Sequence, residues 1–186
     1  GETGPFTGEV SARMLKNLGV THVIIGHSER RKRFHETTEI LNHKLKVALA
    51  AGLTPIVCIG EELEEKTAGQ SEAVWQKQCA EIFKDIQAES LIYIAYEPVW
   101  AISTNKNALP DTPENAAHSV SVITRECNDR GNLTNIKFLY GGSVNSANAA
   151  NFLDIENVSG LLVGGASLKI PDWQNMLAIV RMHLQP

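Results

Sequence analysis

Five short apolar runs, each followed by a glycine or a glutamate, constrain what this chain can fold into more than any other feature. They are apolar nearly throughout, which is typical of strands in a parallel sheet that is covered on both faces. The expected strands are residues 22–25, 54–59, 91–96, 136–140 and 160–163. The residues that close them are Gly26, Gly60, Glu97, Gly141 and Gly164.

Longer amphipathic segments with helical periodicity lie before, between and after these runs. The expected helices are residues 11–18, 38–51, 71–87, 112–130, 147–153 and 171–183. Successive strand ends are about 20 to 45 residues apart, the length of a strand with its crossover connection. No linker or low-complexity stretch interrupts the pattern. The sequence therefore predicts five consecutive βα units in one α/β domain over residues 1–186.

Two architectures accommodate five such units: an open doubly wound sheet, or part of a (β/α)8 barrel. The dinucleotide-binding pattern G-x-G-x-x-G and the P-loop pattern G-x-x-x-x-G-K-[ST] are both missing from the sequence. Those patterns are the commonest reasons for an open sheet. The chemistry expected at the strand ends is therefore of another kind.

Composition excludes several classes of function. The chain has 186 residues, of which 43% are hydrophobic and 20% charged, and a net charge of −4. Such values describe an ordinary globular protein, and the scattered basic residues argue against a nucleic-acid partner. The basic cluster at residues 30–33 is interpreted as a solvated or ion-paired helix entry. We expect no membrane span and no signal peptide, and the three cysteines, without metal or redox spacing, favour the cytoplasm.

Glu97 directly follows the apolar strand at residues 91–96, and a loop stiffened by Pro98 and Trp100 comes next. The carboxyl ends of parallel strands are where α/β enzymes keep their chemistry. Taken alone, Glu97 could equally be a structural carboxylate at the rim of the sheet. His27 lies just past the first strand on the same rim, so the two form a possible acid–base pair. The alternative for His27 is a hydrogen-bonded structural histidine.

Two glycine-rich turns follow the last two strands, at residues 140–143 (Tyr-Gly-Gly-Ser) and 163–167 (Val-Gly-Gly-Ala-Ser). Glycines there let backbone N–H groups approach an anion, with help from the positive end of the next helix. One such pair could be only a tight turn. Two pairs after consecutive strands fit the phosphate site that barrels build from their last two βα loops.

Five motifs together resemble the triosephosphate isomerase family, in the family's order and at its spacing. They lie at residues 7–9 (Thr-Gly-Glu), 26–31 (Gly-His-Ser-Glu-Arg-Arg), 95–102 (Ala-Tyr-Glu-Pro-Val-Trp-Ala-Ile), 140–143 and 160–168. The resemblance implies a TIM barrel that interconverts dihydroxyacetone phosphate and glyceraldehyde 3-phosphate without a cofactor or metal.

The resemblance also implies roles for individual residues. Glu97 would be the base that moves a proton between two carbons, and His27 the neutral electrophile that polarises the carbonyl; this division of roles is known for the family and is not inferred from these residues. Glu29 would be the second carboxylate near the site. Residues 98–106 would form the lid that closes over substrate. Four further residues would hold the substrate phosphate: Ser103, Ser143, Gly164 and Gly165. Thr7 would lie in the loop that interdigitates with a second copy in a dimer.

The chain departs from the family pattern in two places. Its lid contains Ser103 and Asn105 where the family usually has glycines, which predicts altered lid kinetics more than a lost phosphate contact. Harmless variation within the family is the alternative. Residues 1–7 align with the loop after the family's third strand, so the first three βα units are expected to be absent. The asparagine and the phosphate-binding lysine that follow the family's first strand would be absent with them. Five strands cannot close an eight-stranded barrel, and two open sheet edges would then be aggregation-prone.

These departures leave three hypotheses open. The first is an isomerase by descent with weak activity or none, because removing one electrostatic partner of the transition state typically costs about 10²–10³ in rate. The second is a non-catalytic module that binds phosphate or self-assembles. The third, a different phosphosugar enzyme on the same barrel, is disfavoured by the combination of His27, Glu97 and the lid motif. In each case the open edges and the Thr7 loop predict self-association.

Overall fold

The computed structural model of the protein describes residues 3–86, 89–102, 108–129, 133 and 135–183. Within them, five strands form one parallel sheet in the order β1-β2-β3-β4-β5. The strands are β1 (His22–Ile25), β2 (Thr54–Ile59), β3 (Ile92–Tyr96), β4 (Ile136–Tyr140) and β5 (Val158–Leu161). The prediction of consecutive parallel βα units is confirmed. The last strand begins and ends two residues earlier than expected.

Helices connect the strands, and six of them correspond to the predicted segments. These six are α1 (Ala12–Asn17), α3 (Thr38–Ala50), α5 (Ser71–Ile82), α6 (Pro113–Asp129), α7 (Ala149–Leu153) and α8 (Ile170–His183). Helix α5 ends about five residues before its expected boundary, and Asp85 soon after it has a left-handed φ of 56°. Of α2 (Ser28–Phe34), only a helix entry at residues 30–33 was expected. The prediction did not include α4 (Leu63–Thr67) or the 3-10 turns η1 (Val99–Ala101) and η2 (Gly165–Leu168).

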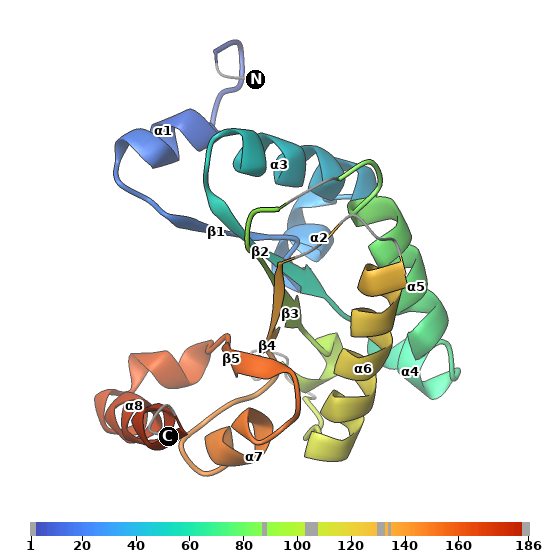
Figure 1. The fold of residues 1–186 in the computed structure, drawn as a ribbon, viewed down its shortest axis with the longest axis vertical. Helices are drawn as coiled ribbons and strands as arrows, with labels where there is room; N and C mark the ends of the chain where they lie inside the picture. Colours follow the sequence, from blue (N-terminus) through green and yellow to red (C-terminus); the bar gives the residue numbers. More distant parts are fainter. Residues whose placement is uncertain (1–2, 87–88, 103–107, 130–132, 134, 184–186) are drawn as a thin grey trace.

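Helices α3, α5 and α6 cover one side of the curved sheet, with α7 and α8 continuing the layer past β5 (Figure 1). The main core lies between this layer and the strands. Leu41 and Leu45 of α3 and Trp75 of α5 are among its fully buried side chains. Because apolar residues of the strands face these helices, sheet and helices each remove the other's apolar surface from water.

The described sheet is open at both ends of its strand order. β1 pairs only with β2, and β5 only with β4, among the described residues. Ile24 of the edge strand β1 is 46% exposed. The predicted open edges are therefore present in this structure. No helix in the described part of the chain is both long and apolar enough to span a bilayer.

Candidate active site

The register of the sheet brings the strand ends together at one rim. Tyr96, the last residue of β3, pairs with Ile59 of β2 and with Tyr140 of β4. Beyond the strand, the backbone N–H of Glu97 donates to the carbonyl of Ile59 at 2.8 Å. Glu97 therefore occupies a fixed position at the carboxyl edge of the central strand, as predicted from its place in the sequence.

His27 and Glu97 lie in direct contact across this rim. The Nε2 atom of His27 lies 2.8 Å from Oε1 of Glu97, and the Glu97 side chain is 1% exposed. Ser28 adds two donors, its backbone N–H at 3.0 Å from Oε2 and its hydroxyl at 3.1 Å from Oε1. A buried carboxylate with three donors is well stabilised, which explains how Glu97 is accommodated in the interior.

The second ring nitrogen of His27 faces the start of a helix. His27 is the N-cap of α2, and its Nδ1 accepts the backbone N–H of Glu29 at 3.3 Å. The neutral imidazole therefore carries its proton on Nε2, toward Glu97. The hydrogen bond to Glu97 raises the pKa of His27 above its ordinary value, burial opposes that rise, and the Glu97 charge reinforces it.

Glu29, expected near the site as a second carboxylate, is placed less directly. Its backbone contacts His27, while its side chain is exposed in the first turn of α2. Its charge contributes to the raised pKa of His27. The basic cluster lies on α2, as predicted: Arg30 pairs with Glu36, and Lys32 with Glu62. Arg31 donates instead to the backbone carbonyls of Gly26 and Cys58, at 2.6 and 2.8 Å, and so ties the ends of β1 and β2 together.

A buried carboxylate that the sequence analysis did not single out supports the loop after Glu97. Glu61 is fully buried, and its two oxygens accept the indole N–H groups of Trp75 and Trp100, each at 2.7 Å. The hydroxyl of Tyr96 lies 3.3 Å from the same carboxylate. Glu61 follows the end of β2 as Glu97 follows β3, and this parallel was the available signal in the sequence.

The glycine turns lie past the neighbouring strands β4 and β5. Ser143 is partly buried, and its carbonyl accepts the side-chain amide of Asn148 at 2.9 Å. Gly164 and Gly165 lie at the start of η2, where the carbonyl of Gly164 accepts the hydroxyl of Ser167 at 2.7 Å. Ser103, the remaining expected phosphate contact, lies outside the described residues, as do residues 104–106 of the lid. Thr7 is exposed in the loop before α1.

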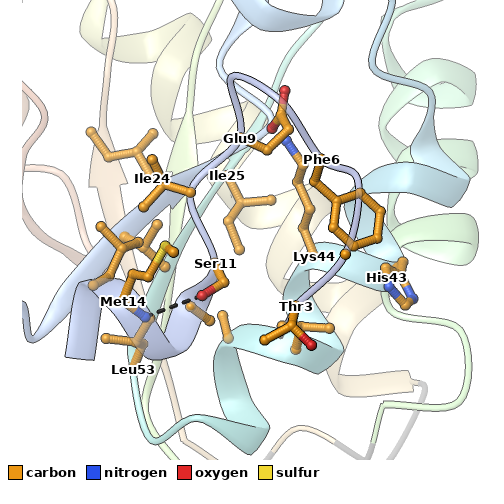
Figure 2. Close-up of a pocket in the computed structure, with 17 residues that line it drawn as sticks. Thr3, Phe6, Glu9, Ser11, Met14, Ile24, Ile25, His43, Lys44 and Leu53 are labelled. Atoms are coloured by element: carbon orange, nitrogen blue, oxygen red, sulfur yellow. Dashed lines mark hydrogen bonds between the residues drawn. The ribbon is translucent and has the colours of Figure 1, made fainter. Parts of the chain in front are cut away.

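A separate apolar cavity of about 570 Å³ lies beside the β1 edge, between the N-terminal loop, α1 and α3 (Figure 2). The side chains of Phe6, Met14, Ile24 and Val47 are among its lining residues, and each is more than a third exposed. The residues expected to act on substrate are not among those that line it. This cavity is therefore a feature of the open edge and not of the His27–Glu97 rim.

A parallel βα sheet with a histidine and a buried glutamate in contact at its carboxyl rim defines a class of protein, the barrel-type α/β enzymes that carry out acid–base chemistry. Comparison with known proteins identifies the family. The model of the triosephosphate isomerase family matches residues 1–182. This chain belongs to the triosephosphate isomerase family, whose members are isomerases that act on a triose phosphate.

Individual relatives agree with this assignment. A triosephosphate isomerase from Paracidovorax citrulli is 46% identical over 179 residues, covering 95% of this chain and 70% of that protein. One from Dictyoglomus thermophilum is 45% identical over 176 residues, covering 94% of this chain and 71% of that protein. The crystal structure of triosephosphate isomerase from Bartonella henselae superposes with a TM-score of 0.84 at 39% identity, covering 97% of this chain and 73% of that one.

Proposed function

We propose that the His27–Glu97 rim catalyses the interconversion of dihydroxyacetone phosphate and glyceraldehyde 3-phosphate. The observation that carries the proposal is the 2.8 Å contact between His27 Nε2 and a Glu97 carboxylate that is 1% exposed. A base and a proton donor in contact at a strand end are the two groups that proton transfer next to a carbonyl requires.

The proposed reaction moves one proton between adjacent carbons. Glu97 removes a proton from the carbon next to the substrate carbonyl, and the electron pair shifts onto the carbonyl oxygen. The Nε2–H of His27 hydrogen bonds to that oxygen and stabilises the charge that develops there. His27 gives its Nε2 proton to that oxygen and takes up the proton of the hydroxyl on the neighbouring carbon, which becomes the new carbonyl. Glu97 returns its proton to the other carbon, so both side chains are regenerated.

The contacts of Glu97 impose a condition on this mechanism. Three donors from His27 and Ser28 hold the carboxylate in the substrate-free structure. Substrate must separate His27 from Glu97 before Nε2–H can reach the carbonyl oxygen. Since the Glu97 hydrogen bond is the main cause of the raised pKa of His27, that separation also favours the neutral imidazole.

We propose that backbone N–H groups of the two glycine turns hold the substrate phosphate, with contributions from Ser143, Gly164 and Gly165, and from Ser103. Gly165 begins η2 and Gly164 caps it, so N–H groups without helical partners are available at this point. Glu29 contributes through its charge on His27. These assignments follow the family motifs and are tested by substitution.

The decisive experiment replaces Glu97 with glutamine and measures isomerisation in a coupled assay. Gln keeps the shape but cannot accept a proton, so we expect activity to fall by about 10²–10⁴-fold, the range for a general base. Glu39→Gln is the control: Glu39 is exposed in the first turn of α3 and should leave activity within about twofold of the parent. Equal activity of Glu97→Gln and the parent would contradict the proposal, and phosphate binding without isomerisation would favour a non-catalytic module.

Weak activity of the 186-residue chain stays a prediction. It rests on the phosphate-binding lysine after the family's first strand, for which the sequence has no counterpart at a comparable strand end. A turnover number within about tenfold of a longer family enzyme, assayed side by side, would contradict it.

We also propose that copies of this chain associate through the β1 edge, with the Thr7 loop as a second contact. In the part of the chain that the structure describes, β1 pairs with a strand on one side only, and the apolar cavity beside it adds exposed surface that association would cover. Light scattering at micromolar concentration should give a mass above 20.3 kDa. Ile24→Lys should lower that mass, whereas Leu168→Lys, at an exposed site beyond β5, should not. A well-folded parent monomer would refute the proposal.

The three cysteines support a reducing compartment, and we infer a cytoplasmic location. Cys58, Cys79 and Cys127 are all buried. Burial and the nearby Glu97 charge raise the pKa of the Cys58 thiol well above its ordinary value, so this cysteine acts as a small apolar core residue. Disulfide-bonded material purified from an oxidising compartment would contradict the inference.

A further inference from the structure

Asp111 and Tyr140 form a contact that joins the end of the segment after Trp100 to the first glycine turn. The hydroxyl of Tyr140 donates to Oδ2 of Asp111 at 3.0 Å. Tyr140 is the last residue of β4 and is fully buried, and Asp111 lies just before α6. The two residues are 29 positions apart in the sequence, so only the folded chain brings them together.

The other oxygen of Asp111 is held by the start of α6. Oδ1 accepts the backbone N–H of Thr112 at 2.9 Å and the side-chain amide of Asn115 at 2.8 Å. The Oδ1 atom of Asn115 in turn accepts a hydrogen bond from the ammonium of Lys66 at 2.9 Å. That ammonium lies 4.2 Å from the centre of the Trp100 ring. A carboxylate whose other oxygen is held by two donors has little freedom to rotate, so Oδ2 offers Tyr140 a fixed acceptor.

Tyr140 supports the glycine turn from below. Its ring stacks on Phe152 with a centroid distance of 3.8 Å and an interplanar angle of 8°. A Cβ atom built on Gly142 would lie only 2.2 Å from the Tyr140 hydroxyl oxygen. The backbone of Gly142 therefore rests on that oxygen, and a displacement of the hydroxyl must displace the turn that ends at Ser143.

The electrostatics of the pair keep the proton on Tyr140. Burial and the charge of Asp111 raise the pKa of Tyr140, so the phenol remains the donor. Burial also raises the pKa of Asp111, while the hydrogen bonds from Tyr140, Thr112 and Asn115 and the charge of Lys66 oppose that rise. The carboxylate thus depends on all of these partners for its stability in a partly buried position.

We propose that Asp111 is a positioning residue for the phosphate site: by fixing the Tyr140 hydroxyl, it sets the position of the backbone at Gly142 and Ser143. The inference rests on the proposed function, in which this turn holds the substrate phosphate. The contacts of Asp111 are with Tyr140, Thr112 and Asn115, and of these Tyr140 is the one that reaches the glycine turn.

The test compares two variants that remove the same hydrogen bond with one that weakens only the helix start. Tyr140→Phe removes the donor and leaves the contacts of Asp111 with α6 intact. Asp111→Ala removes the acceptor. Thr112→Ala is the matched control, because it deletes the hydroxyl that accepts the Asn115 N–H at 3.2 Å in α6 and leaves Tyr140 untouched.

Two readouts separate positioning from general destabilisation. The first is the KM for dihydroxyacetone phosphate, which should rise about tenfold in Tyr140→Phe and in Asp111→Ala, because each variant loses one charge-assisted hydrogen bond. The kcat should fall by a smaller factor. The KM of the double variant should be within about threefold of the KM of the more affected single variant, since both substitutions remove the same interaction. The second readout is amide hydrogen exchange of Gly142 and Ser143 in the substrate-free chain, which should quicken in both variants. Thr112→Ala should lower the melting temperature and leave KM and these exchange rates within about twofold of the parent.

The outcomes distinguish this inference from the proposed function. Faster exchange at Gly142 and Ser143 in a chain that neither isomerises nor binds inorganic phosphate would support the positioning role and contradict the proposed function. Unchanged exchange and unchanged KM in Tyr140→Phe would overturn the positioning role in an active enzyme. An equal effect of Thr112→Ala on both readouts would also overturn it.

Discussion

His27 and Glu97, 70 positions apart in the sequence, meet at 2.8 Å across the rim of the sheet. His27 is fixed by its place as N-cap of α2, and Glu97 by the hydrogen bond of its backbone N–H to Ile59. Because both residues are anchored by the backbone, the pair exists before substrate arrives. Its protonation in the substrate-free protein is open to direct measurement.

The raised pKa of His27 predicts a pH-dependent contribution to stability. The hydrogen bond to Glu97 is the largest cause of that rise. Since the pKa is higher in the folded protein than the ordinary 6.5 of the unfolded chain, the extra stability is fully present below about pH 6.5 and is lost as the pH rises through the folded pKa. NMR titration should show the pKa of His27 lowered in Glu97→Gln. The difference in melting temperature between the parent and His27→Gln should be larger at pH 6 than at pH 9; a constant difference would contradict the pairing.

Glu61 should be important for stability although it is remote from the proton transfer. Replacing Glu61 with Gln leaves one oxygen for the indole N–H groups of Trp75 and Trp100, because the new amide nitrogen is a donor. A buried N–H left without an acceptor costs about 1–3 kcal/mol, so the free energy of unfolding should fall by that amount. Urea unfolding measures it. Glu64→Gln, at an exposed site in α4, should change it by less than about 0.5 kcal/mol, and equal effects at the two sites would contradict the role of the buried network.

Gly60 should not tolerate alanine. A Cβ atom at this position would lie 1.8 Å from the backbone carbonyl oxygen of Glu97, so the backbone that carries the proposed base would have to move. We expect Gly60→Ala to lower isomerase activity by at least about 10²-fold, because misplacement by about 1 Å has that effect on catalysis. Gly160→Ala in β5 provides the comparison. Its Cβ would meet the flexible end of Leu139 at 3.2 Å, and its activity should be within about threefold of the parent. Full activity of Gly60→Ala would show that catalysis does not require the close contact between Gly60 and the backbone carbonyl of Glu97.

Glu36 predicts an acid-sensitive contribution at the end of α2. Glu36 is only 7% exposed, and its carboxylate pairs with Arg30 and Lys44, each at 2.5 Å. Burial acts to raise the pKa of Glu36, but the hydrogen bonds and charges of the two cations outweigh it and lower the pKa. The stability from this pairing is therefore present above the ordinary pKa of 4.5 and is lost as the pH falls through the lowered value.

Glu36→Gln tests this contribution. The variant should be less stable than the parent by about 1–3 kcal/mol at pH 7, because two partly buried cations lose a charged acceptor. Below the lowered pKa of the folded protein the two proteins should become similar, since the parent carboxylate is then protonated as well. Chemical unfolding at pH 7 and at low pH measures the difference in free energy of unfolding between the two proteins. A difference that persists at low pH would indicate that packing, and not charge, is its cause.

Parallel strands were the most predictable part of the fold. Buried strands are apolar on both faces, so β2 and β4 appear in the sequence as nearly continuous apolar runs, with Lys137 as the exception in β4, and with the boundaries that the structure has. Only a helix entry at residues 30–33 was predicted, and not the extent of α2, because its exposed charged residues show no apolar periodicity. Its start depends on the His27 side chain as a cap. The site was predictable to a similar extent, since His27 and Glu97 follow directly from their places after strands.

Local sequence determines which residues follow each strand, and in a parallel sheet that places His27, Glu97 and the glycine turns at one rim. Only the tertiary structure decided which of these groups touch and how their charges are balanced. Ser28 reaches Glu97, Glu61 accepts two indoles, and Asp111 holds Tyr140, each across 14 to 69 residues of sequence. The physical reason is that the order of strands and turns is set by local sequence. The hydrogen bonding and desolvation of a buried polar group depend instead on which distant side chains pack around it.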